Sequence, residues 1–151
     1  MTQPGVRGRA ERMRDTLRRL AHDVDVWVAS AGPGGAPYLV PLSYLWTGTE
    51  VLLATSRGNP TGRNLRAAGR VRLALDGTRD VVLIDGTVTM VGLDAVPAEL
   101  ADEFAAHTGF EPRRLPTHAY FRVRPDTVQV WREVDEFADR YLMRAGRWLD
   151  T

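Results

Sequence analysis

The run VDVWVASAGPGGAPYLVPLSYLWTGTEVLLATS, residues 24–56, is the most informative part of the chain, because three β-rich segments follow one another across short turns. Its first segment alternates apolar with polar or small side chains, which is typical of a half-buried strand. Turn-forming residues occupy positions 32–35 and 47–50. The pattern predicts an antiparallel meander that begins with a hairpin. The strands predicted here span residues 24–31, 38–46 and 51–55.

After this meander, the chain combines further strands with short helices. Residues 59–68 are predicted to form a helix, because Pro60 suits a first helical turn and Gly69 is a natural C-terminal cap. A second helix is expected over residues 97–108, with Gly109 at its end. The remaining strands are predicted at residues 71–75, 81–91, 119–123 and 127–131.

Two dipeptides bear on how these later strands are divided. Asp85-Gly86 predicts a bulge or a bend inside one long strand. Pro125-Asp126 is expected to separate the last two strands, which we interpret as a closing pair. Residues 141–149 give no clear prediction.

Residues 6–22 predict an amphipathic helix that packs on the sheet, because Met13, Leu17 and Leu20 recur at helical spacing. The segment is rich in arginine. We interpret these arginines as a solvated face and do not expect nucleic-acid binding, because no aromatic side chain lies among them. They are Arg7, Arg9, Arg12, Arg14, Arg18 and Arg19.

Composition narrows the class of protein. The length of 151 residues fits one domain over residues 1–151, and short strands with inserted helices favour a mainly β fold: an antiparallel barrel with peripheral helices. The chain has no cysteine and only 3 histidines, so we expect no disulfide and no metal centre. No apolar run reaches the roughly 20 residues of a membrane span, and no signal-peptide pattern is present. We therefore expect a cytoplasmic protein without membrane contact.

Residues 53–65, LATSRGNPTGRNL, carry the side chains most typical of a ligand site. A strand ends in hydroxyl groups and a helix begins beside arginines, a combination that suits a phosphate group. A polar turn with surface arginines is the alternative interpretation. The side chains concerned are Thr55, Ser56, Arg57, Arg63 and Asn64.

Other polar and aromatic residues have less specific patterns. Trp27, Tyr44, Trp46 and Trp131 lie in predicted strands, where core or interface packing is the usual role. A general acid, if one exists, is as plausibly Tyr44 or Tyr120 as His118, or a bound water. His118 could also bind haem. Arg79 and Asp80 are neighbours, and a local ion pair or a turn cap is expected there.

The order of several segments resembles one known family. These segments are residues 24–56, then TGRNLRAAGRVRLAL, TRDVVLIDGTV and VQVWREVDEFADRYLMRAGRW. Together they are similar to the pyridoxamine 5′-phosphate oxidase-like family of FMN-binding split barrels, which includes actinobacterial relatives that use the deazaflavin F420. The resemblance covers residues 22–149 and implies a six-stranded antiparallel split barrel. It also implies a homodimer that holds one flavin or deazaflavin in a groove between the subunits.

The resemblance also assigns roles by position. The backbone of Leu39, Val40, Pro41 and Leu42 would run along the cofactor ring. The cofactor phosphate would be held by Thr55, Ser56, Arg57, Arg63 and Asn64. Trp131 resembles a late-strand aromatic residue near the dimer groove.

The function implied by the resemblance is an oxidoreductase that transfers hydride between the cofactor and a small organic substrate. FMN and F420 both remain open. The C-terminal arginine motif that pyridoxamine 5′-phosphate oxidases use for their substrate has no counterpart we can place, so vitamin B6 oxidation is not expected. A non-catalytic flavin or haem carrier is the alternative.

Overall fold

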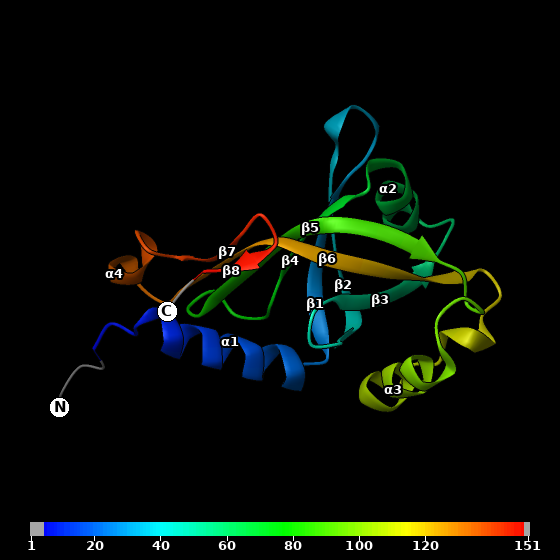
Figure 1. Ribbon diagram of the computed structural model, residues 1–151. Helices are drawn as coiled ribbons and strands as arrows, with labels where there is room; N and C mark the ends of the chain where they lie inside the picture. The colour runs from blue at the N-terminus through cyan, green and yellow to red at the C-terminus, as the bar shows by residue number, and fades with distance from the viewer. Residues whose placement is uncertain (1–4, 150–151) are drawn as a thin grey trace.

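The computed structural model describes residues 5–149 and has a β-barrel at its centre with helices on the outside (Figure 1). The strands are β1 Asp25–Ala31, β2 Pro37–Trp46, β3 Val51–Ser56, β4 Arg70–Ala74, β5 Val81–Val91, β6 His118–Trp131, β7 Tyr141–Arg144 and β8 Arg147–Trp148. The helices are α1 Arg9–His22, α2 Pro60–Ala68, α3 Ala98–Thr108 and α4 Val134–Phe137, with short 3-10 turns at Pro33–Gly35 and Pro112–Arg114.

Six strands close the barrel. They follow the order β3-β2-β1-β4-β5-β6, every neighbouring pair is antiparallel, and β3 returns to pair with β6. The strands β7 and β8 continue from β6 outside this ring. The expected mainly β fold with a six-stranded antiparallel barrel is confirmed. The predicted meander is confirmed as well, because β1 pairs with β2 and β2 with β3.

The prediction of a closing pair of strands around Pro125-Asp126 is wrong. Both predicted strands belong to the single strand β6, which pairs with β5 along its length. The pairing register shifts where Asp85 faces Thr127 and Gly86 faces Pro125, so Asp126 is an extra residue on β6. A side chain at position 86 would meet the carbonyl oxygen of Arg124 at 2.3 Å, which explains the glycine.

Hydrophobic side chains form two clusters, one on each side of the barrel wall. The larger cluster fills the interior and includes Leu53, Leu73 and Phe121. The smaller one lies between the wall and α3, where Phe104 packs edge-on against Tyr120 with ring centroids 5.6 Å apart. The inside and the α3 side of the wall are therefore both apolar, which leaves other outward faces free for function.

The helix α1 packs against the barrel, and Leu20 belongs to the interior cluster. The interpretation of its arginines as a solvated face is wrong for two of them: Arg7, just before α1, is 4% exposed and Arg12 is 2% exposed. Both are buried because carboxylates near the C-terminus pair with them, a partner choice that the local sequence cannot show. Within the described chain, none of the helices is both long and apolar enough to cross a bilayer.

Residues 141–149, whose structure could not be predicted from the sequence, contain β7 and β8. The pairing of Arg79 with Asp80 that was expected from their adjacency does not occur. Arg79 pairs with Glu133, whereas Asp80 lies among the guanidinium groups of Arg7, Arg19 and Arg132. Segments distant in the sequence therefore supply the partners.

Candidate cofactor-binding site

The connection from β3 to α2 is organised by Asn59. Its side-chain oxygen accepts a hydrogen bond from the Gly62 N–H (2.7 Å), which caps α2. Its amide group donates to the hydroxyl of Thr55 at 2.8 Å, at the buried end of β3. One side chain therefore fixes the start of the helix to the end of the strand.

Gly62 lets α2 approach β3 closely. A Cβ at this position would lie 2.1 Å from the carbonyl oxygen of Ser56 and 3.1 Å from that of Arg57. Any side chain here would push the helix away from the strand end. The glycine thus keeps the end of β3 next to the first turn of α2.

Three arginines surround this connection, and none forms an ion pair with a carboxylate among residues 5–149. Arg63 donates to the carbonyl of Gly58 (2.8 Å), Arg66 to that of Arg57 (3.2 Å) and Arg57 to that of Pro116 (3.3 Å). Each guanidinium has five N–H donors, so most donors stay available at this exposed surface. The connection therefore carries a positive charge that its own residues do not neutralise.

The amide groups of the α2 N-terminus contribute less than the sequence suggested. Pro60 has no N–H, the Gly62 N–H is bonded to Asn59, and the Arg63 N–H donates to the carbonyl of Asn59 (2.9 Å). An anion here would depend on guanidinium groups, on the one remaining amide of this turn, the Thr61 N–H, and on the Ser56 hydroxyl, which accepts a long hydrogen bond from the Gly58 N–H (3.3 Å). The donors that remain fit a phosphate group.

Asn64 faces the neighbouring hairpin. Its amide donates to the hydroxyl of Ser30 on β1 (3.1 Å), and the side chain is largely buried. Asn64 therefore joins α2 to the β1–β2 hairpin, which projects beyond the barrel beside α2 (Figure 1).

The part of β2 expected along the cofactor ring has one open edge. β2 pairs with β1 from Pro37 to Ser43 but with β3 only through Tyr44–Trp46. Leu39 and Pro41 point outward and are exposed, whereas Val40 and Leu42 alternate with them and pack against the interior cluster. This strand offers an apolar outer face and backbone groups without a neighbouring strand.

The structure brings some predicted site residues together and not others. Ser56 and His118 are cross-strand partners, so His118 lies near the β3–α2 connection. Trp131 lies at the opposite end of β6, roughly 40 Å from His118 at the usual rise of a strand, and its ring packs edge-on against Phe137 (5.3 Å). Within one chain, Trp131 is not part of the site at Ser56.

The two tyrosines considered as proton donors are enclosed. The Tyr44 hydroxyl donates to the carbonyl of Leu20 (2.9 Å), and burial raises the pKa of Tyr44 well above its ordinary value. Tyr120 lies under α3, where burial also raises its pKa. Neither hydroxyl is open to a substrate.

Asn59, Gly62 and Arg66 are site residues that the sequence analysis missed. Asn59 was recognisable, because asparagine before proline at a helix start is a typical N-cap. Arg66 follows Arg63 by three residues and therefore lies on the same side of α2. The close approach that requires Gly62 has no sequence signal.

By its fold, this protein belongs to the class of split barrels. Its β3–α2 connection adds a basic turn that no carboxylate among residues 5–149 neutralises, next to the open edge of β2. The profile of the family described as pyridoxamine 5′-phosphate oxidase matches residues 13–132. The chain belongs to this family.

Solved structures confirm the fold. An F420 reductase is 16% identical with a TM-score of 0.62 and covers 74% of this chain and 93% of its own. An FAD-binding protein from Mesorhizobium loti is 19% identical with a TM-score of 0.63, and the match covers 77% of this chain and 89% of that protein. A protein of unknown function from Agrobacterium tumefaciens is 20% identical with a TM-score of 0.69, and the match covers 93% of this chain and 64% of that protein. At these identities the likeness shows the fold alone, and no curated protein matches the sequence.

Proposed function

We propose that this protein binds FMN or F420 by its phosphate at the β3–α2 connection and is a flavin- or deazaflavin-dependent oxidoreductase acting on a small organic substrate. The observation that carries the proposal is the set of arginines without carboxylate partners, Arg57, Arg63 and Arg66, placed beside Ser56. Three positive charges in one turn repel one another, so their concentration there does not stabilise the fold and suits an anionic ligand. Membership in the family and flavin-binding proteins among structures of the same fold support the proposal.

The residues divide into two groups by the part of the cofactor that they would hold. The guanidinium groups and the Ser56 hydroxyl would bind the phosphate, and Asn59 and Thr55 would keep the turn in place. The open edge of β2 at Val40, Pro41 and Leu42 would hold the ring through backbone groups. The bound cofactor would supply the hydride chemistry, while the protein orients the reactants and excludes water.

We further propose a homodimer. Pro41, Trp27, Ala74 and Leu83 are cross-strand neighbours in one row across β2, β1, β4 and β5. Trp27 on this row is 41% exposed, and Leu39 in the next row is 59% exposed. Apolar side chains at the centre of an outward sheet face are typical of a surface that a second copy covers.

Cofactor titration tests the binding proposal. FMN and F420 are added separately to the purified protein, and fluorescence quenching is followed. Arg63→Ala should weaken binding by about 1–3 kcal/mol, the range for losing a charge-assisted hydrogen bond. Arg14→Ala is the matched control, because Arg14 is an exposed arginine on α1. Micromolar binding of neither cofactor, or equal affinity in the two variants, would contradict the proposal.

Light scattering at several protein concentrations tests the dimer. Trp27→Glu places a charge in the apolar row at an exposed position, so the monomer should still fold. The wild type should have the mass of a dimer and the variant that of a monomer. If Trp27 were ordinary surface, both proteins would have the same mass.

A carrier without turnover is the second candidate, and the enclosure of Tyr44 and Tyr120 favours it. The third candidate, His118, lies with its ring 5.8 Å from that of Phe110, and no carboxylate among residues 5–149 forms a hydrogen bond with it. Consumption of reduced cofactor in the presence of an added acceptor would support the enzyme. A Soret band that disappears in His118→Ala would support haem binding instead.

A further inference from the structure

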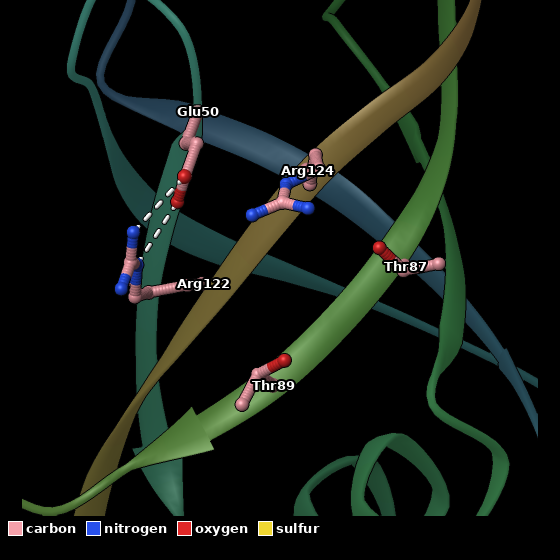
Figure 2. A pocket seen from close by; sticks show the side chains of 5 residues that line it. All are labelled: Glu50, Thr87, Thr89, Arg122 and Arg124. Carbon is pink, nitrogen blue, oxygen red and sulfur yellow. Dashed lines mark hydrogen bonds and ion pairs between the residues drawn. The ribbon is translucent and has the colours of Figure 1, made fainter. Parts of the chain in front are cut away.

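A polar concavity lies on the outer face of the barrel, over β5 and β6 (Figure 2). It has a volume of about 160 Å³. Polar side chains from β5, β6 and the turn before β3 form its lining. They are Glu50, Thr87, Thr89, Arg122 and Arg124.

The strand register places two hydroxyls opposite two guanidiniums. Thr87 faces Arg124 and Thr89 faces Arg122 across β5 and β6. Because side chains two residues apart share a face, all four project from the same side of the sheet. Figure 2 shows the Thr87 hydroxyl on the side of β5 that faces Arg124.

Arg122 is held in place by Glu50. The Nε and Nη2 groups of Arg122 donate to the two carboxylate oxygens at 2.9 and 3.0 Å. This two-point contact fixes the guanidinium and leaves its other N–H groups unused. Glu50 neutralises one of the two positive charges of the concavity.

Arg124 and the two hydroxyls have no such partner. Among the described residues, none of the three side chains forms a hydrogen bond or an ion pair. The nearby carboxylate of Asp126 lies 3.5 Å from Arg70 instead. One uncompensated positive charge and two free hydroxyls therefore line the same hollow.

We propose that this concavity binds an oxyanion, the carboxylate or phosphate group of a small molecule. The fork of Arg124 matches two oxygens of such a group, and Thr87 and Thr89 donate hydrogen bonds to them. The volume corresponds to about five water molecules, enough for an oxyanion and a few further atoms. None of the residues that line the concavity belongs to the connection between β3 and α2, so this site is distinct from the turn that holds Arg63.

The test is an NMR titration of the full chain with inorganic phosphate and, separately, with glutarate at low ionic strength. Amide shifts should map to Thr87, Thr89 and Arg124. Arg124→Ala should weaken binding about tenfold or more, and Thr87→Val about threefold, because a charged donor contributes more than a neutral one. The response to glutarate or to phosphate identifies the head group, and a response to either supports the site.

Glu50→Gln is expected to act in the opposite direction. It removes the negative charge from the rim and should strengthen anion binding at least threefold. Arg14→Ala, with the same loss of charge on α1, should leave the amide shifts of Thr87, Thr89 and Arg124 unchanged. Equal affinity in Arg124→Ala and Arg14→Ala would mean an adventitious ion only and would overturn the proposal, whatever the outcome with FMN or F420.

Discussion

Arginines from other segments lie near the two ends of β6, and their surroundings differ. Near Trp131, the buried Arg7 and Arg12 meet carboxylates at 2.9 Å. At the β3–α2 connection beside His118, the exposed Arg63 bonds a backbone carbonyl, and none of the carboxylates of residues 5–149 pairs with it. Arginine thus links segments of the fold where carboxylates pair with it, and it keeps free N–H donors where they do not. The arrangement of carboxylates, more than the number of arginines, decides which arginines are paired and which keep free donors.

The buried end is a clasp between the N-terminal segment and the C-terminal helix α4. Glu136 accepts hydrogen bonds from the Arg7 side chain at 3.1 and 2.9 Å, from the Arg7 backbone at 3.1 Å and from the Arg132 backbone at 2.9 Å. Arg12 donates to the carbonyls of Val130 and Asp139. A buried pair of this kind adds little net stability, but removing one partner leaves a buried charge unpaired.

The largest expected effect is therefore the loss of Glu136. Glu136→Ala should lower the free energy of unfolding by about 3–5 kcal/mol, because the guanidinium of Arg7 stays buried without its main partner. Urea denaturation measures the change. Glu11→Ala, an exposed carboxylate on α1, should change stability by less than about 0.5 kcal/mol. Equal losses in the two variants would remove the distinction between the ends.

Acid should weaken the same clasp. Burial opposes ionisation of Glu136, but hydrogen bonds from Arg7 and from the Arg132 backbone outweigh it and lower the pKa of Glu136 to about 2. A carboxyl whose pKa falls on folding stabilises the protein above its unfolded pKa of 4.5, and this contribution disappears as the pH falls towards 2.

Glu136 should therefore account for a loss of about 3 kcal/mol of unfolding free energy between pH 5 and pH 2. Urea midpoints across this range measure it. Glu136→Gln does not titrate, so its stability should depend less on pH by about that amount. Parallel pH curves for the variant and the wild type would contradict the assignment.

A smaller effect is expected at the other end of β6. Asn59→Ala removes the cap of α2 and the bond to Thr55, and should cost about 1 kcal/mol of unfolding free energy. Asn59→Asp keeps the acceptor for the Gly62 N–H and should retain most of that stability. If both variants lost the same amount, the amide bond to Thr55 would be the more important contact.

Much of the fold could be predicted from local patterns. Alternation in residues 24–56 gave three strands, and Pro60 with Gly69 gave the bounds of α2. The continuity of β6 could not be predicted in this way. Proline usually interrupts a strand, but here the bulge at Asp126 accommodates it while pairing with β5 continues.

The candidate site was predictable only in part. Ser56, Arg57 and Arg63 lie together because they are close in sequence. The partners of Arg7 were not predictable, since Glu136 lies 129 residues away. The same is true of Arg124 and Thr87, whose juxtaposition depends on the register of β5 against β6.

The smallest effect on stability is expected for Arg63→Ala, and this variant tests most directly whether the two ends of β6 differ. Arg63→Ala removes an exposed side chain whose one hydrogen bond reaches a carbonyl open to water, so unfolding free energy should change by less than about 0.5 kcal/mol. Urea denaturation without cofactor measures this change in unfolding free energy. A loss above 2 kcal/mol would mean that Arg63 fastens the turn as Arg7 fastens the clasp. If Arg63 serves the ligand and not the fold, the variant should keep its stability and bind FMN or F420 more weakly.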